Sequence, residues 1–181
     1  PAYTTYTQDD YNYLVEDCTP SLVIVSNNEM LKKLNNIIDV NDFIKKVITL
    51  DDLEKIIQNQ NLNKKEKFLS FNSIIKNNLL DNKKIENNKL KRTSPACIIY
   101  TSRTGGNPKG VILSHGGILN NLVGACEITK PLFTSRPVFL TWLPLSESYE
   151  HCVQFLQIAV GEKVIYEEKI EKLIDNIAKA K

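Results

Sequence analysis

Residues 96–115 contain most of the side chains whose types and spacing could do chemistry. An apolar run at residues 96–100 gives way abruptly to hydroxyl-bearing residues, glycines and a lysine, namely Thr101, Ser102, Thr104, Gly105, Gly106 and Lys109. Glycines let the backbone approach a ligand closely, and free N–H groups, hydroxyls and an ammonium group together can surround a polyphosphate. The pattern predicts a buried strand that runs into a loop that binds nucleotide phosphates.

Neither of the two most familiar phosphate-binding patterns fits this loop. A Walker A loop needs Gly-Lys followed by Ser or Thr, but Pro108 precedes Lys109 and Gly110 follows it. The dinucleotide pattern Gly-x-Gly-x-x-Gly is also absent from the loop. A plain glycine turn would account for the two adjacent glycines, but the neighbouring hydroxyls and lysine favour phosphate binding. Ser114-His115 lacks the Gly-x-Ser-x-Gly elbow of a hydrolase, so we do not interpret it as a catalytic pair.

Residues 101–111 as a whole resemble a known signature. They read TSRTGGNPKGV, which is similar to the phosphate-loop pattern T-S-G-T-[TG]-G-x-P-K-G-V of the adenylate-forming (AMP-binding) enzymes. Leu113, Ser114 and His115 also fit the family. Arg103 departs from it, because it stands where the family has glycine.

A second resemblance begins at Trp142, where the chain reads WLPLSESYEH. This segment is similar to the L-P-L-x-H-x-x-E segment of long-chain fatty-acid:CoA ligases, a subgroup of the same superfamily. Glu150 matches the last position of that pattern, whereas Glu147 replaces the family histidine, which lies beside the acyl-substrate site. His151 does not occupy the histidine position, and we predict it to be a histidine on a helix surface.

The resemblance implies an ATP-dependent fatty-acid:CoA ligase. In that family, ATP and a fatty acid form an acyl-adenylate with release of pyrophosphate, and the thiol of coenzyme A then displaces AMP. The phosphates would lie against the loop, usually with Mg²⁺, at Thr101, Ser102, Thr104, Gly105, Gly106 and Lys109. Glu150 would support the metal or the loop indirectly. Adenylation of a carboxylate needs no general base, so no catalytic residue is assigned.

Two other interpretations stay open at the level of sequence. Because of the departures at Arg103 and Glu147, the chain could be a degenerate, non-catalytic α/β remnant of such an enzyme. It could also come from an adenylating ligase that acts on shorter or aromatic acids, since only the Trp142 segment points to long acyl chains.

Composition bounds the remaining possibilities. The chain has 23 Lys and Arg residues against 21 Asp and Glu residues, a net charge of +2, so no strong field points to nucleic acid or an anionic membrane. The four cysteines are far apart and suggest neither a disulfide framework nor a zinc site. There is no apolar run of transmembrane length and no signal-like start. We therefore expect a cytoplasmic protein with at most peripheral membrane contact.

Strand-like and helix-like patterns alternate along the chain, as in an α/β fold with a doubly wound, mostly parallel sheet and helices on both faces. Strands are expected over residues 21–25, 46–50, 96–100, 138–143 and 163–166, with 96–100 in a central, buried position. Helices are expected over residues 7–18, 30–38, 51–58, 71–80, 114–126, 149–160 and 170–181. Because open α/β sheets bind ligands at the carboxyl ends of their strands, residues 101–109 should form an exposed loop at such an end.

This organisation predicts three parts. Residues 1–80 would be a partial α/β subdomain, residues 81–92 a flexible linker rich in Asn and Lys, and residues 93–181 a truncated segment that carries the phosphate loop. The resemblance places all three in the large N-terminal domain of the AMP-binding enzyme fold. We find neither the family's Y-G-x-T-E segment nor the C-terminal domain with its catalytic lysine. We therefore expect an interior fragment that is inactive alone, with a fatty acid as substrate and a complementary fragment of the same enzyme as partner.

Overall fold

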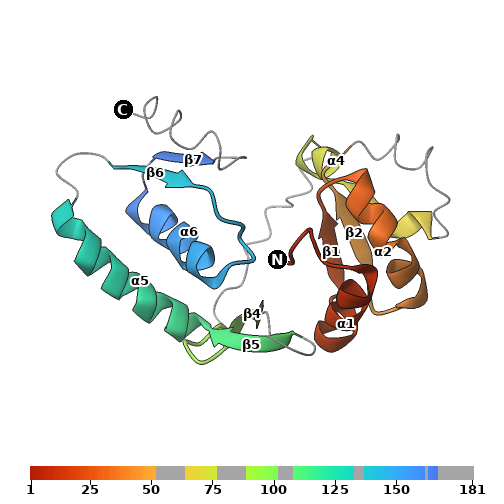
Figure 1. Cartoon of the computed structure of the whole chain (residues 1–181), viewed down its shortest axis with the longest axis horizontal. Coiled ribbons are helices and arrows are strands. Elements are labelled where there is room, and N and C mark those ends of the chain that lie inside the picture. The colour runs from red at the N-terminus through yellow and green to blue at the C-terminus, as the bar shows by residue number, and fades with distance from the viewer. Residues whose placement is uncertain (52–63, 77–88, 102–107, 133–136, 162, 167–181) are drawn as a thin grey trace. The chain divides into compact units, whose positions relative to one another are not determined.

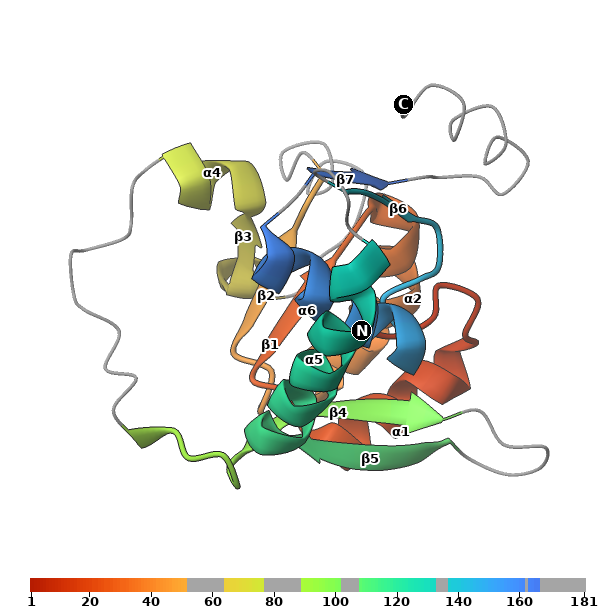
Figure 2. The same cartoon turned by 90° about the vertical axis from the view of Figure 1, so that its left-hand side faces the viewer.

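The computed structural model in Figure 1 describes residues 1–51, 64–76, 89–101, 108–132, 137–161 and 163–166. Figure 2 shows the same elements from the side. The chain divides into two compact units, one formed by Thr4–Glu86 and the other by Pro1–Tyr3 together with Asn87–Lys181. The predicted α/β class with mostly parallel strand pairing is confirmed, although the described strands form three small sheets.

The first unit begins with helix α1, Gln8–Cys18, whose start is fixed by a capping box. The Thr7 hydroxyl accepts a hydrogen bond from the Asp10 backbone N–H at 3.2 Å, and the Asp10 carboxylate accepts one from the Thr7 N–H at 2.9 Å. These two bonds satisfy backbone donors that a helix start otherwise leaves without partners. The helix ends at Thr19, which has a left-handed backbone (φ 40°) just before Pro20. The helix predicted at this place is therefore confirmed.

A parallel sheet follows, with strand order β1-β2-β3. Its strands are β1 (Leu22–Val25), β2 (Lys46–Thr49) and β3 (Phe68–Ser70), and helix α2 (Asn28–Val40) connects the first two. A short 3-10 helix, η1 (Lys65–Lys67), precedes β3, and helix α4 (Phe71–Lys76) follows it. β3 was not predicted, because its three residues lie within a tract rich in Asn and Lys. The predicted helix over 51–58 lies almost wholly outside the described residues.

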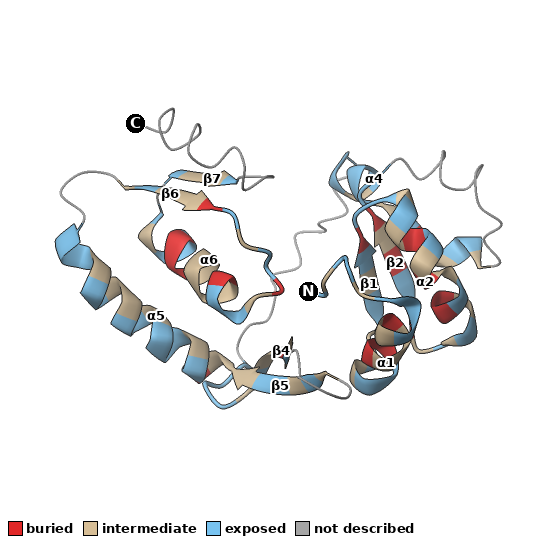
Figure 3. Ribbon diagram, in the orientation of Figure 1, coloured by how far each residue is buried: buried red, intermediate tan, exposed pale blue. Residues whose placement is uncertain are grey.

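The core of this unit lies between α1, α2 and one face of the sheet. Side chains alternate along each strand, so Val25 is 2% exposed while its neighbour Ile24 is 62% exposed. Figure 3 shows the buried positions in red. A fully buried aliphatic side chain stabilises the fold by about 1.5–3 kcal/mol. The buried cluster consists of Tyr11, Val15, Val25, Leu31, Leu34, Ile37, Ile38, Ile44, Val47 and Phe68.

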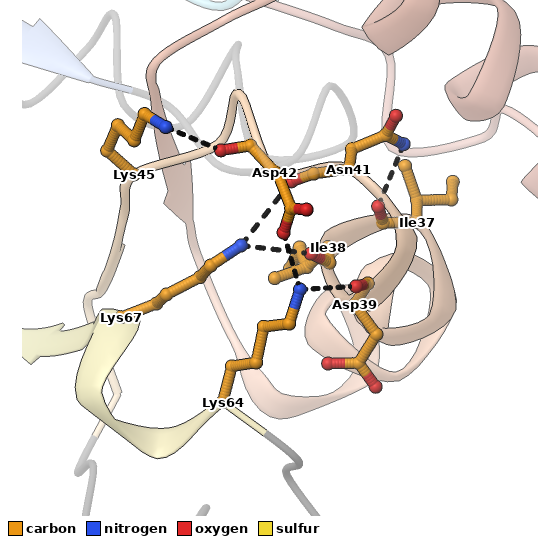
Figure 4. A network of polar contacts seen from close by, with 8 residues as sticks. All are labelled: Ile37, Ile38, Asp39, Asn41, Asp42, Lys45, Lys64 and Lys67. Atoms are coloured by element: carbon orange, nitrogen blue, oxygen red, sulfur yellow. Dashed lines mark hydrogen bonds and ion pairs between the residues drawn. The ribbon is translucent and has the colours of Figure 1, made fainter.

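Lysines from outside helix α2 cap its C-terminal end, as Figure 4 shows. The Lys64 ammonium group donates to the Asp39 carbonyl oxygen at 2.8 Å. The Lys67 ammonium group donates to the carbonyl oxygens of Ile38 and Asn41, both at 3.4 Å. The last turn of α2 contains no basic residue of its own. The two lysines therefore supply the positive charge that the negative end of a helix dipole favours.

The described part of the second unit contains two further pairs of strands and two long helices. Strands β4 (Pro95–Thr101) and β5 (Lys109–Ser114) form an antiparallel hairpin, and helix α5 (His115–Thr129) follows directly. A 3-10 turn, η3 (Lys130–Leu132), ends α5. Strands β6 (Val138–Thr141) and β7 (Lys163–Tyr166) are parallel, and helix α6 (Ser148–Val160) connects them and packs against α5.

The position predicted for residues 96–100 is wrong. β4 pairs antiparallel with β5 and with no other described strand, so it is not a central parallel strand. Only Ile99 is buried in it, at 8% exposure, whereas Ile98 is 39% exposed. The run of β-branched residues indicated a strand correctly, but such a pattern does not identify the partner strand. That partner was missed because residues 109–114 were assigned to the loop and to the cap of the next helix.

Other local predictions in this unit are confirmed. The Ser114 hydroxyl caps α5 by accepting a hydrogen bond from the Gly117 N–H at 3.1 Å. α6 ends at Gly161, whose positive φ of 73° suits a residue without a side chain. The helix predicted for residues 170–181 lies outside the described residues. In the described part of the chain, no helix has both the length and the apolar character needed to cross a membrane.

Candidate phosphate-binding site

The hairpin of β4 and β5 places two of the predicted phosphate ligands opposite each other. Thr101 is the last residue of β4 and Lys109 is the first residue of β5, and they form the pair nearest the loop. The Thr101 hydroxyl donates to the Lys109 carbonyl oxygen at 3.4 Å. Both residues are exposed. The Lys109 ammonium group is therefore available at the base of the loop, and the Thr101 hydroxyl could donate to a ligand in exchange for its long bond to the Lys109 carbonyl oxygen.

The loop itself, residues 102–107, lies outside the described residues. The candidate ligands Ser102, Thr104, Gly105 and Gly106 fall in it, as does the family departure Arg103. For these five residues the predicted roles stay predictions.

The next pair of the hairpin, Tyr100 and Gly110, is tightly packed. A Cβ atom on Gly110 would lie 3.2 Å from two ring atoms of Tyr100 and 3.0 Å from the Cγ2 atom of Ile98. This is closer than most carbon atoms approach, so the ring would have to shift by a few tenths of an ångström to admit a side chain at position 110. The sequence analysis gave no role to either residue of this pair.

A second glycine fixes the junction between the hairpin and helix α5. The Gly116 N–H donates to the Arg92 carbonyl oxygen at 2.7 Å, and a Cβ atom on Gly116 would lie 2.8 Å from that oxygen. One residue earlier, the His115 N–H donates to the Ser94 carbonyl oxygen at 3.1 Å. The Arg92 guanidinium group also donates to the Asn120 side chain at 2.6 Å. These contacts join residues 92–94 to the start of α5, and no local sequence pattern indicated them.

The two acidic residues singled out from the Trp142 segment lie at the start of α6. Glu147 occupies the N-cap position, and its carboxylate accepts a hydrogen bond from the Tyr3 hydroxyl at 2.7 Å. Glu150 is in the first turn and is only 3% exposed. Its Oε1 atom is buried and accepts no hydrogen bond from the described part of the chain. Glu150 therefore has a buried carboxylate oxygen that could accept a hydrogen bond, and it lies near the positive end of a helix dipole.

His151 lies on helix α6, as predicted, and it is half-buried there. Its ring packs edge-on against Phe155, with 5.2 Å between the ring centres.

The thiol of Cys97, on strand β4 of the hairpin, is partly protected from solvent. Burial raises the pKa of Cys97 above its usual value, which disfavours the thiolate and makes Cys97 a poor candidate for a nucleophile.

Comparison with protein families gives a match over the whole chain. The model of the family described as AMP-binding enzyme matches residues 1–181. The chain is 33% identical over 134 residues to the octapeptide-repeat antigen of Plasmodium falciparum (isolate NF7 / Ghana). The matched region covers 72% of this chain and 19% of that protein. It is 39% identical over 84 residues to the peroxisomal long chain acyl-CoA synthetase 6 of Arabidopsis thaliana, which covers 46% of this chain and 12% of that protein.

Two solved structures illustrate the similarity in fold. One is a putative long-chain-fatty-acid CoA ligase from Rhodopseudomonas palustris CGA009, with a TM-score of 0.70, 19% identity, and coverage of 92% of this chain and 37% of that one. The other is ATP-bound MatB from Rhodopseudomonas palustris, with a TM-score of 0.69, 20% identity, and coverage of 99% and 32%. This chain therefore spans about a third of these solved chains and less than a fifth of the two curated relatives above.

Proposed function

Because this chain belongs to the AMP-binding enzyme family, we propose that it contributes the phosphate-binding hairpin of an ATP-dependent fatty-acid:CoA ligase. The observation that carries this proposal is the opposed pair of Thr101 and Lys109, exposed at the two ends of the loop between β4 and β5. A hydroxyl and an ammonium group on opposed residues suit the oxygens of a polyphosphate. The long chain acyl-CoA synthetases among the relatives support a fatty acid as the acyl substrate.

In the proposed reaction, a carboxylate oxygen of the fatty acid attacks the α-phosphorus atom of ATP. The bond from that phosphorus to the oxygen bridging to the β-phosphate breaks, and pyrophosphate leaves with the electron pair. The thiol of coenzyme A, on losing its proton, then attacks the acyl carbon and displaces AMP. The contribution of Lys109, Thr101 and the loop is electrostatic, because they neutralise charge that moves onto the β-phosphate as pyrophosphate departs.

Mg²⁺ would enter as part of the Mg–ATP substrate. The described residues contain no group of three or more His, Cys, Asp or Glu side chains that could hold a metal ion by themselves. Magnesium is usually held by substrate phosphates together with one or two carboxylates, so this donor set fits a metal bound mainly to ATP. Glu150, with its buried carboxylate oxygen that accepts no hydrogen bond from the described residues, is our candidate for indirect support of the metal or the loop.

The proposal is tested by titrating the chain with Mg–ATP in a calorimeter. Lys109→Met should weaken binding by about tenfold to a hundredfold, because a hydrogen bond to a charged group contributes about 1.5–3 kcal/mol and each 1.4 kcal/mol is tenfold. Lys163→Met is the matched control, since Lys163 is an exposed lysine at the start of β7, outside the hairpin. Absence of saturable ATP binding by the unmodified chain would favour the non-catalytic remnant. Binding that Lys109→Met leaves unchanged would place the nucleotide elsewhere.

A further inference from the structure

Within the described residues, the hairpin that carries Thr101 and Lys109 is not part of a larger sheet. Among the described strands, β4 and β5 pair only with each other. An isolated two-stranded hairpin is only marginally stable in water, so its geometry depends on side-chain contacts between the two strands. The contact nearest the loop that involves a large side chain is that of Tyr100 with Gly110.

Tyr100 and Gly110 adjoin the two candidate phosphate ligands on both strands. Tyr100 precedes Thr101 in β4, and Gly110 follows Lys109 in β5. Because side chains alternate between the two faces of a strand, the Tyr100 ring lies on the face opposite to Thr101 and Lys109. The ring therefore packs behind the pair of ligands, where it does not compete with a nucleotide for space.

The absence of a side chain at Gly110 is what lets the ring lie there. A Cβ atom at position 110 would be 3.2 Å from the Cε1 and Cζ atoms of Tyr100 and 3.0 Å from Ile98 Cγ2. Glycine in a strand interior is unfavourable by itself, and an aromatic ring packed across it from the neighbouring strand offsets that cost. The close approach of the ring favours glycine over a residue with a side chain at this position of the hairpin.

We propose that Tyr100 and Gly110 form a brace, an aromatic ring packed across a glycine, that holds Thr101 and Lys109 opposite each other for binding a triphosphate. Both are positioning residues, since neither faces the phosphates. The inference deepens the proposed function and rests on it for the part that concerns nucleotide binding. The brace consists of the ring of Tyr100, whose Cε1 and Cζ atoms lie nearest to position 110.

Four variants distinguish a specific effect of the contact between Tyr100 and Gly110 from a general loss of stability of the hairpin. Tyr100→Leu removes the ring but keeps an apolar side chain of moderate size, and Gly110→Ala adds the Cβ atom that the ring excludes. Tyr100→Phe keeps the ring and removes only the hydroxyl. Ile112→Ala is the matched control, because Ile112 lies on the same face of β5, is 65% exposed and is further from the loop.

Two measurements are made on each variant of the whole chain. Calorimetry gives the affinity for Mg–ATP, and NMR gives the cross-strand proton contacts between residues 101 and 109 together with their amide exchange. Tyr100→Leu and Gly110→Ala should weaken ATP binding and speed the exchange of the amides of residues 101 and 109 by about fivefold, the size expected for loss of a cross-strand contact of about 1 kcal/mol. Tyr100→Phe and Ile112→Ala should change neither quantity by as much as twofold.

The outcomes are distinguishable. If Ile112→Ala has the same effect as Tyr100→Leu, or if Tyr100→Phe loses as much as Tyr100→Leu, the brace is wrong. If the unmodified chain does not bind ATP, the proposed function fails, but the NMR contacts between residues 101 and 109 still decide whether the ring positions them. Should Gly110→Ala fail to fold, Tyr100→Leu decides alone, with thermal unfolding showing that it remains folded.

Discussion

Glu150 has two properties that conflict energetically. Only 3% of its surface is exposed. Its Oε1 atom is buried and accepts no hydrogen bond from the described residues. Leaving a buried polar group without a partner costs about 1–3 kcal/mol, more when it is charged. The start of α6 offsets only part of this, because a carboxylate in the first turn of a helix gains about 0.3–1 kcal/mol. The desolvation cost is therefore the larger effect.

We predict that Glu150→Gln raises the free energy of unfolding by about 1 kcal/mol, because the amide has nearly the same shape and carries no charge. Urea unfolding at neutral pH measures this change. Glu147→Gln is the matched control at the same helix start, and it should not stabilise the chain, because the Glu147 carboxylate already accepts a hydrogen bond from Tyr3. A Glu150→Gln variant that is less stable than the unmodified chain would show that the carboxylate has a strong donor, and would contradict this reading.

Among the elements, the lysine cap of α2 joins the end of that helix to residues 25 to 29 positions later in the chain. The Lys64 ammonium group, which donates to the Asp39 carbonyl oxygen, also forms an ion pair with Asp42 Oδ1 at 2.7 Å (Figure 4). Lys45 donates to the Asp42 carbonyl oxygen at 2.8 Å. The ion pair between Lys64 and Asp42 therefore connects the residues after α2 to those before β3.

This ion pair predicts a dependence of stability on pH. The hydrogen bond from Lys64, with the charge of its ammonium group, holds the pKa of Asp42 below its ordinary value of 3.8. A carboxyl whose folded pKa is depressed stabilises the fold above its unfolded pKa, and this stability is lost as the pH falls through the folded pKa. The difference in stability between the unmodified chain and Asp42→Asn should thus be constant above about pH 5 and shrink below about pH 4.

Chemical unfolding of both proteins between pH 3 and pH 6 tests this, with the other acidic residues common to both. The Asp42 side chain is 87% exposed, so added salt should reduce the difference. A difference that stays constant down to pH 3 would mean that the ion pair does not form in solution.

Helices were the elements that the sequence predicted best, because their signals are local. The Thr7 capping box, the Ser114 cap and the glycine at position 161 each lie within a few residues of the end that they define. Strand pairing has no such local signal. The apolar run at residues 96–100 indicated a strand, but only the structure showed that its partner is β5.

In the candidate site, too, the residue types could be predicted from the sequence but the pairing of the strands could not. The residue types of Thr101 and Lys109 indicated phosphate binding, but their placement opposite each other follows from the register of β4 and β5. The close approach of Gly116 to Arg92 joins two segments that are far apart in the sequence, and no sequence pattern connects them. Likewise, nothing in the WLPLSESYEH segment distinguished the buried Glu150 from an exposed one.

For the molecule as a whole, the extent of the match matters as much as its identity. Long chain acyl-CoA synthetase 4 of Arabidopsis thaliana matches over 100% of this chain, yet the match covers 28% of that protein. Adenylation requires groups that hold the adenosine, the fatty acid and the departing pyrophosphate at once, because a misplacement of about 1 Å can cost a hundredfold in rate. Among these groups, the candidates found in this chain concern only the phosphates.

We therefore predict that the 181-residue chain, assayed alone, binds Mg–ATP but catalyses no fatty-acid-dependent exchange of pyrophosphate into ATP. Adding the remaining part of a long chain acyl-CoA synthetase, produced as a separate polypeptide, should make the exchange detectable, since that part would supply the adenosine and acyl sites. The exchange should require the fatty acid and should disappear with Lys109→Met but not with Lys163→Met. Fatty-acid-dependent exchange by the chain alone would contradict this prediction directly. Failure to recover exchange, with ATP binding intact and the two polypeptides shown to associate, would instead indicate a nucleotide-binding remnant that has lost catalysis.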